Sequence, residues 1–238
     1  MIETCINMPA PLIPESAVER AGKLGSALLA DGMKGLDVQN DGAMRSAINP
    51  VDASMRVVGT AFTLETEDGD NLPIHLAMKL LRDGYVLVID GKGYEGKAYF
   101  GDLIARQCRS MGASGIVIDG CVRDRDEITA MGYPVFSSGF MQRGPGKRSP
   151  GRVNCPIVCG GARGNPGDLV VGDADGVTVV PREKLEEALA AAERKDAYER
   201  ERRDRMAAYD RAKAEGGELF SLSPAWVDEM LAELGLRL

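Results

Sequence analysis

The chain has 238 residues, enough for one well-cored domain with an extension or for two small domains. Its formal net charge of −7 at pH 7 argues against a nucleic-acid groove or an anionic membrane surface as the main partner. Residues 1–5 show no basic segment leading into an apolar one, and no apolar run reaches ~20 residues. With five scattered cysteines, these features predict a cytoplasmic protein without a signal peptide or a membrane span.

The only histidine is His75, which excludes chemistry that needs a histidine pair or a histidine-rich metal site. A Ser-His-Asp triad would have to use His75, which lies in an apolar, helix-like segment. Cys155 and Cys159 form a C-x3-C pair, without the second pair that a structural zinc site requires. The sequence therefore favours oxygen ligands and a hard cation such as Mg²⁺ or Mn²⁺.

Periodicity and breaker residues predict the following elements in chain order: helix 14–35, strand 55–66, helix 72–83, strand 85–90, a glycine-rich loop 91–101, helix 103–111, strand 115–119, a tight turn at 119–120, helix 124–131, strand 133–137, loop 141–152, short strands over 153–180, and a charged helix from 181 to about 214. Residues 85–90 form a continuous apolar run, as in strands that are buried on both faces. The middle of the chain alternates β-α-β-α-β, so we predict an α/β fold with parallel strands and right-handed crossovers.

In a parallel α/β sheet, ligands bind beyond the carboxyl ends of the strands. The segments that follow Asp90 and Asp119 leave the same edge of the predicted sheet, so they should converge there. Helix 103–111 begins at that edge, and the backbone N–H groups of Leu103 and Ile104 lack intrahelical acceptors. Together with the helix dipole, these groups predict a site for an anion.

Two further residues extend this predicted site. Arg123 can donate two parallel hydrogen bonds to a carboxylate, and Asp124 offers a hard oxygen ligand for a metal. Simpler interpretations exist, because Asp102 could serve only as a helix N-cap, and Arg123 and Asp124 could form only a surface ion pair. The convergence of both segments favours a pocket for a small carboxylate and a divalent metal.

The chain resembles the class II 4-hydroxy-4-methyl-2-oxoglutarate/4-carboxy-4-hydroxy-2-oxoadipate (HMG/CHA) aldolases, which share a superfamily with the regulator of ribonuclease activity A. The matching pattern is Gly101-Asp102 followed by Gly112-x-x-Gly115-x-Val117-x-Asp119-Gly120-x-x-Arg123-Asp124. The resemblance runs from about residue 14 to 180. It implies a swivelling β/β/α catalytic domain over 1–180, with the central β-α-β-α-β unit. It also implies a C-terminal helical extension over 181–238 that contacts a neighbouring subunit.

The resemblance also implies a homotrimer or homohexamer with sites at subunit interfaces, and a Mg²⁺ or Mn²⁺ cofactor, with Co²⁺ a further option. By motif, Arg123 and the segment Gly101, Asp102, Leu103 and Ile104 hold the pyruvyl end of the substrate. Asp124 binds the metal, and Glu199 from a neighbouring subunit approaches it through water.

The implied activity is retro-aldol cleavage of HMG to two pyruvates and of CHA to pyruvate and oxaloacetate, with oxaloacetate decarboxylation as a side reaction. This lyase chemistry would belong to aromatic-acid degradation by protocatechuate or gallate meta-cleavage. Asp102 would hold a water that acts as the base, and Lys147 or Arg148 could contact the distal carboxylate. The rival classes are a non-catalytic regulator that binds ribonuclease E and a phosphohistidine carrier built on His75.

Overall fold

The computed structural model describes residues 3–236. The strands are β1 (Cys5–Ile6), β2 (Asn49–Pro50), β3 (Val57–Glu65), β4 (Tyr85–Ala98), β5 (Gly115–Val122), β6 (Val135–Phe140), β7 (Arg152–Val153), β8 (Ile157–Cys159), β9 (Ala162–Gly164), β10 (Leu169–Asp173) and β11 (Gly176–Val180). The helices are α1 (Glu15–Met33), η1 (Gln39–Gly42), α2 (Leu72–Ala77), α3 (Asp102–Ser110), α4 (Arg125–Met131), η2 (Arg182–Lys184), α5 (Leu185–Ala214) and α6 (Ala225–Glu233).

The chain divides into two compact units, one up to Glu193 and the other from Arg194. The predicted boundary at residue 180 falls before α5, whereas this division falls within it. None of the helices described between residues 3 and 236 combines the length and apolar character that a bilayer crossing requires.

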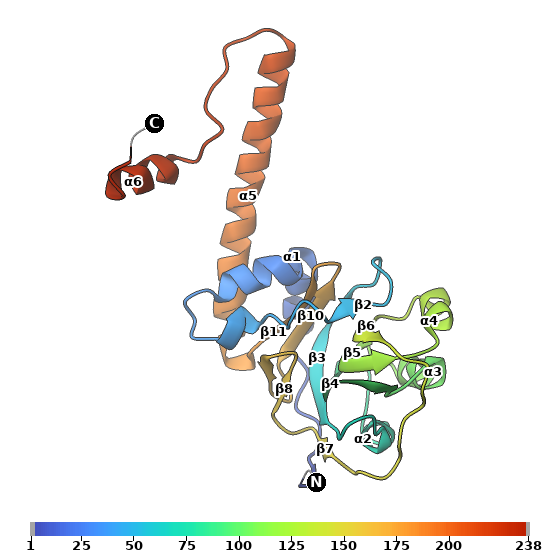
Figure 1. Ribbon diagram of the computed structural model, residues 1–238. Helices are drawn as coiled ribbons and strands as arrows, with labels where there is room; N and C mark the ends of the chain where they lie inside the picture. Colours follow the sequence, from blue (N-terminus) through green and yellow to red (C-terminus); the bar gives the residue numbers. More distant parts are fainter. Residues whose placement is uncertain (1–2, 237–238) are drawn as a thin grey trace. The chain divides into compact units, whose positions relative to one another are not determined.

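The predicted parallel core is confirmed. Strands β3, β4, β5 and β6 are neighbours, and each pairs with the next in parallel. The sheet order is β1-β7-β3-β4-β5-β6-β2, and the β10–β11 hairpin pairs in antiparallel fashion with the first half of β3, on the same edge as β7. Helices α3 and α4 supply the crossovers that parallel strands need, as the β-α-β-α-β pattern predicted (Figure 1).

The side chains of the central strands alternate between two hydrophobic cores. Phe62, Leu87 and Ile118 belong to the core beneath α2, α3 and α4. Val88 and Val117 point to the opposite face, which is covered by the separate β8–β9 sheet and by side chains of the β10–β11 hairpin. The alternation follows from the period of two in a strand, and it produces the β/β/α layering that the resemblance implied (Figure 1).

Helix α1 packs on β10, β11 and the first two turns of α5 in a third cluster. The predicted helix 14–35 is interrupted at Gly25, whose φ of 79° is left-handed. Asp173 stabilises the break, because its carboxylate accepts hydrogen bonds from the N–H of Ser26 at 2.7 Å and from its hydroxyl at 2.6 Å. The predicted helix 72–83 is also shorter than expected, since α2 ends at Ala77.

The prediction of a loop over 91–101 and of a turn at 119–120 was wrong. β4 continues to Ala98 with two register shifts, and it pairs Tyr94 with Gly120 and Ala98 with Cys121. Gly120 therefore lies inside β5, where a Cβ atom would come within 2.8 Å of the Tyr99 ring. The glycine permits a close approach of this ring to the strand instead of forming a turn.

Candidate active site

A cavity of about 280 Å³ lies where the first turn of α3 meets the connection between β5 and α4. It is at the carboxyl end of β5, the edge of the sheet at which the sequence placed the site. Its lining comprises Asn71, His75, Phe100, Gly101, Asp102, Leu103, Ile104, Gln107, Arg123, Asp124, Pro145 and Lys147. All the predicted site residues of the first unit are thus brought together.

Gly101 and Asp124 form the closest contact of the site. Gly101 is the N-cap of α3, and the carboxylate of Asp124 accepts a hydrogen bond from the backbone N–H of Asp102 at 3.2 Å. A Cβ atom on Gly101 would lie 2.8 Å from Cγ of Asp124 and 3.0 Å from Cγ of Arg123. Only glycine at position 101 lets the β5–α4 connection approach the helix N-terminus this closely.

We expect Gly101→Ala to reduce activity by at least about tenfold, because the added methyl group displaces Asp124 and Arg123 from the first turn of α3. The unfolding temperature should fall much less than for a core substitution, since only the cavity wall moves. A Gly132→Ala variant is the comparison, because at this left-handed glycine a methyl group meets no neighbour and adds backbone strain outside the cavity. Full activity of Gly101→Ala would show that this close approach is dispensable.

Asp102 is the first residue of α3 and follows the N-cap residue, which is Gly101. The interpretation of Asp102 as a simple N-cap is therefore wrong. One oxygen of Asp102 instead accepts a hydrogen bond from Nε of Arg106 at 3.0 Å, one turn along the helix. Next to it, Leu103 is 71% exposed, so an apolar side chain borders the mouth of the cavity.

Arg123 and Asp124 lie at the start of α4. The backbone N–H of Arg123 donates to the carbonyl of Phe100 at 3.0 Å, which ties this connection to the segment before α3. Nε of Arg123 is 3.6 Å from Oδ2 of Asp124, and the Arg123 side chain is 43% exposed. Such a loose, solvated pair contributes little stability, so the guanidinium can bind a ligand carboxylate at small cost.

Asp124 is held in an unusual backbone conformation. Its φ of 59° and ψ of 48° are left-handed, a region that residues other than glycine, asparagine and aspartate rarely adopt. Conformations of this kind cost about 1–3 kcal/mol and are concentrated at functional sites. This conformation aims the carboxylate back at the N-terminus of α3.

The cavity offers two carboxylates to the divalent metal that the resemblance implies. Asp102 and Asp124 both line the cavity, and each has one carboxylate oxygen bonded to a neighbour and one without a hydrogen bond among residues 3–236. Within the same residues, no group of three or more His, Cys, Asp and Glu side chains could enclose a metal. Two carboxylates fit Mg²⁺, which keeps several waters and takes one or two protein ligands. The residues present are thus compatible with a hydrated hard cation.

The cavity contains two residues that were not expected in the site, Asn71 and His75, and one of the two that were expected near the distal carboxylate, Lys147. His75 lines the cavity from α2, although it was interpreted as a residue of an apolar helix. Asn71 is 3% exposed, and its Oδ1 has no hydrogen-bond partner in the described part of the chain, so an acceptor is left beside the cavity. Lys147 lines the cavity, whereas Arg148 does not. Asn71 and His75 could have been placed in the site from the order of elements. Because α2 follows β3, it starts at the same edge of the sheet as α3.

We expect the His75 ring to titrate below its ordinary pKa of 6.5, because burial and then the positive charge of Lys147 lower its pKa. The unfolded chain then binds more protons below pH 6.5, so this group lowers stability as the pH falls through that value. Proton NMR on untagged protein can follow this single histidine directly. Lys147→Ala should move the midpoint upward while leaving it below 6.5. A midpoint that does not respond to this change would contradict the Lys147 contribution.

Glu199 lies on the part of α5 that belongs to the second unit. Its carboxylate accepts a hydrogen bond from Arg203 at 3.4 Å and lies 3.9 Å from Nζ of Lys195. Its approach to a metal from a neighbouring subunit stays a prediction.

Comparison with known proteins now identifies the family. Residues 26–179 match the family model described as RraA-like, Aldolase/RraA, so the chain belongs to the RraA-like family. A relative from Halalkalibacterium halodurans, named "Putative 4-hydroxy-4-methyl-2-oxoglutarate aldolase", is 40% identical over 154 residues, which cover 65% of this chain and 73% of that protein. A protein of the same name from Burkholderia mallei is 34% identical over 136 residues, covering 57% and 82%.

Solved structures agree with this assignment. An uncharacterized protein from Pseudomonas syringae matches with a TM-score of 0.72 and 26% identity, covering 84% of this chain and 96% of that one. RraAS2 from Streptomyces coelicolor, described as an unusual member of the RNase ES inhibitor RraA protein family, also has a TM-score of 0.72 and 26% identity. That match covers 81% of this chain and 98% of RraAS2. The mixed α/β fold and the family are therefore shown, and the names of the relatives support an aldolase.

Proposed function

We propose that this protein is a divalent-metal-dependent pyruvate aldolase that cleaves HMG to two pyruvates and CHA to pyruvate and oxaloacetate. The observation that carries the proposal is the shared cavity of Arg123, Asp124, Asp102 and the first turn of α3. It combines a guanidinium, a helix N-terminus and two carboxylates, the groups that a 2-oxo acid and a hard cation require. Aromatic-acid degradation by protocatechuate or gallate meta-cleavage is the pathway in which such substrates arise.

The pyruvyl end of the substrate binds at the N-terminus of α3, where the backbone N–H groups of Leu103 and Ile104 face the carboxylate. A water held by Asp102 removes the proton from the hydroxyl group at C4. The C3–C4 bond then breaks, the new carbonyl compound leaves, and the electron pair forms the enolate of pyruvate. Protonation at C3 completes the reaction.

Arg123 stabilises the negative charge that develops on the enolate oxygen, because its guanidinium lines the cavity and its backbone is tied to the segment before α3. Asp124, with help from Asp102 through water, would hold the Mg²⁺ or Mn²⁺ ion, and Co²⁺ is a further option. When bound, this ion supplies Lewis-acid polarisation of the 2-oxo acid. Decarboxylation of oxaloacetate passes through the same enolate, so the same residues should support it.

The far end of the substrate carries a further carboxylate. Lys147 lines the cavity and supplies a positive charge that suits it. Because Arg148 is not among the lining residues, Lys147 is the better of the two candidates. The 2-oxo acid substrate would then lie between Lys147 and the N-terminus of α3.

A homotrimer or homohexamer is part of this proposal. In the second unit, α6 exposes an apolar row with a spacing of four residues, formed by Trp226, Met230 and Leu234 at 56%, 46% and 65%. Apolar rows of this kind mark surfaces that bind another chain. The row supports a subunit contact by the C-terminal extension, through which Glu199 would approach a neighbouring site.

The direct test is pyruvate release from HMG, coupled to lactate dehydrogenase, after treatment with EDTA and again after Mg²⁺ is restored. We expect no release with EDTA and full release with Mg²⁺. No release under either condition from folded protein would instead favour a non-catalytic regulator, and a pull-down with ribonuclease E would then test that alternative. Labelling of His75 by phosphoenolpyruvate would indicate the phosphohistidine carrier.

A further inference from the structure

A second cavity, of about 370 Å³, lies at the carboxyl end of β3 and beside the middle of β4. Glu65 ends β3 and pairs in register with Asp90 of β4, so the two carboxylates are adjacent at the edge of the sheet. None of the residues that line this cavity lines the candidate active site. Its volume falls within the range of small-molecule sites.

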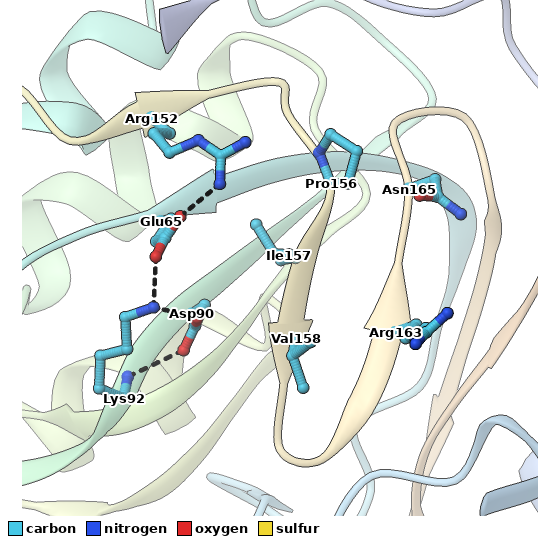
Figure 2. A pocket seen from close by; sticks show the side chains of 9 residues that line it. All are labelled: Glu65, Asp90, Lys92, Arg152, Pro156, Ile157, Val158, Arg163 and Asn165. Atoms are coloured by element: carbon cyan, nitrogen blue, oxygen red, sulfur yellow. Dashed lines mark hydrogen bonds and ion pairs between the residues drawn. The ribbon is translucent and has the colours of Figure 1, made fainter. Parts of the chain in front are cut away.

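The two carboxylates form the floor of this cavity, and neighbouring cations neutralise their negative charge. Nζ of Lys92 donates to Oδ2 of Asp90 at 2.7 Å and also to Oε1 of Glu65. From the other side, Nη1 of Arg152 donates to Oε2 of Glu65 at 2.9 Å. Figure 2 shows Lys92 beside both acids and Arg152 reaching Glu65 from the opposite direction. These contacts cancel the negative charge that would otherwise repel an anion.

Lys92 is fixed in place by its own backbone. Its φ of 60° is left-handed, and its N–H donates to Oδ1 of Asp90 at 3.0 Å. Asp90 therefore holds Lys92 at both ends, through the main chain and through the ammonium group. Burial alone lowers the pKa of Lys92, but hydrogen bonds to Asp90 and Glu65 outweigh burial and leave that pKa raised. Strained, anchored residues of this kind are typical of functional sites.

The cations, not the acids, face the open side of this cavity. The Lys92 and Arg152 side chains are 40% and 34% exposed, against 6% and 15% for Asp90 and Glu65. Arg163, on β9, lines the cavity, is exposed, and has no hydrogen bond or ion pair within residues 3–236. The lining therefore holds three cations and two carboxylates, and one cation is left for a ligand.

The wall between these cations is apolar. Ile157 and Val158 on β8 line the cavity, and Val158 is 50% exposed in spite of its branched hydrocarbon side chain. Figure 2 places both residues between the Glu65–Lys92 pair and Arg163. A solvated cluster of surface charges needs no such wall, whereas a ligand with a carbon skeleton would cover it.

We propose that this cavity is a second binding site, which takes a small organic anion with its oxyanion group at Arg163 and its carbon skeleton on the exposed side chain of Val158, the residue opposite Arg163 in the β8–β9 pair. A carboxylate and a phosphate ester share the chemistry that this site recognises. The proposal does not depend on the aldolase reaction, because no residue of the first cavity takes part.

Isothermal titration of the full chain tests the proposal, with succinate and inorganic phosphate as the two probes. All variants carry Arg123→Ala, so that anion binding in the first cavity does not contribute. We expect saturable binding of at least one probe at one site per chain. Arg163→Ala should weaken it by about tenfold or more, as expected for the loss of a charge-assisted contact. The probe that binds more tightly identifies the source of the oxyanion group.

Two further variants keep the test decisive. Arg82→Ala is the matched control, because Arg82 donates a hydrogen bond to the carbonyl of Leu81 and lies outside this cavity, and binding should be unchanged. Val158→Glu adds a negative charge at an exposed position, so binding should weaken without loss of the fold. The absence of saturable heat for both probes, or equal affinity in Arg163→Ala and Arg82→Ala, would overturn the proposal.

Discussion

Replacing Arg123 by alanine is expected to lower pyruvate release from HMG by about 10²–10³-fold, or on the order of 3 kcal/mol of transition-state stabilisation. The loss should appear in kcat, because the guanidinium acts on charge that develops only when the C3–C4 bond breaks. Oxaloacetate decarboxylation should fall in parallel, since it forms the same enolate. The side chain is 43% exposed and its ion pair with Asp124 is loose, so the fold should be retained.

Two variants make this result interpretable. Arg123→Lys retains the charge but not the two-pronged geometry, and it should recover only part of the activity. Arg109→Ala removes an arginine from the last turn of α3, outside the cavity, and should behave as the unchanged protein. Near-normal turnover of Arg123→Ala in both assays would remove Arg123 from the mechanism.

The second large effect is expected for Asp124→Asn. We expect the affinity for Mg²⁺ or Mn²⁺ to fall by at least about 10–100-fold. Even the loss of a residue that only hydrogen-bonds to a metal ligand lowers metal affinity by this much. Asparagine tolerates the left-handed backbone, and its amide oxygen can still accept the hydrogen bond from the N–H of Asp102. The variant should therefore stay folded while losing the charge that the metal requires.

Binding of Mn²⁺, followed by paramagnetic resonance, measures this loss separately from catalysis. Asp126→Asn is the matched control, because Asp126 lies in the first turn of α4 but does not line the cavity. Unchanged Mn²⁺ affinity in Asp124→Asn, or full activity of the unaltered protein in excess chelator, would exclude Asp124 as the ligand.

The central part of the fold was predictable because its signals are local. Continuous apolar runs marked β4 and β5, and helical periodicity between them marked α3, so the parallel order followed from the right-handed crossover rule. The same reasoning placed Gly101 and Arg123 at one edge of the sheet, and both residues line the same cavity.

The predictions of a loop over 91–101 and of a turn at 119–120 failed because the contacts that form these segments join residues far apart in the chain. Residues 91–98 look like a glycine-rich loop, but they extend β4 because β5 offers partners at Gly120 and Cys121. Gly120 itself looks like part of a turn, although its role is to admit the ring of Tyr99. Glycine is compatible with both situations, so local sequence could not separate them.

The sequence by itself determined the parallel α/β core and the residues that carry the proposed chemistry, because strand and helix periodicity and side-chain chemistry are properties of short segments. Only the tertiary structure decided how close these residues come. The contact between Gly101 and Asp124, the addition of His75 and Lys147 to the cavity, and the neutralised floor at Glu65 and Asp90 each depend on packing between separate elements. Such packing is fixed by close contact between whole layers, and no short stretch of sequence records it.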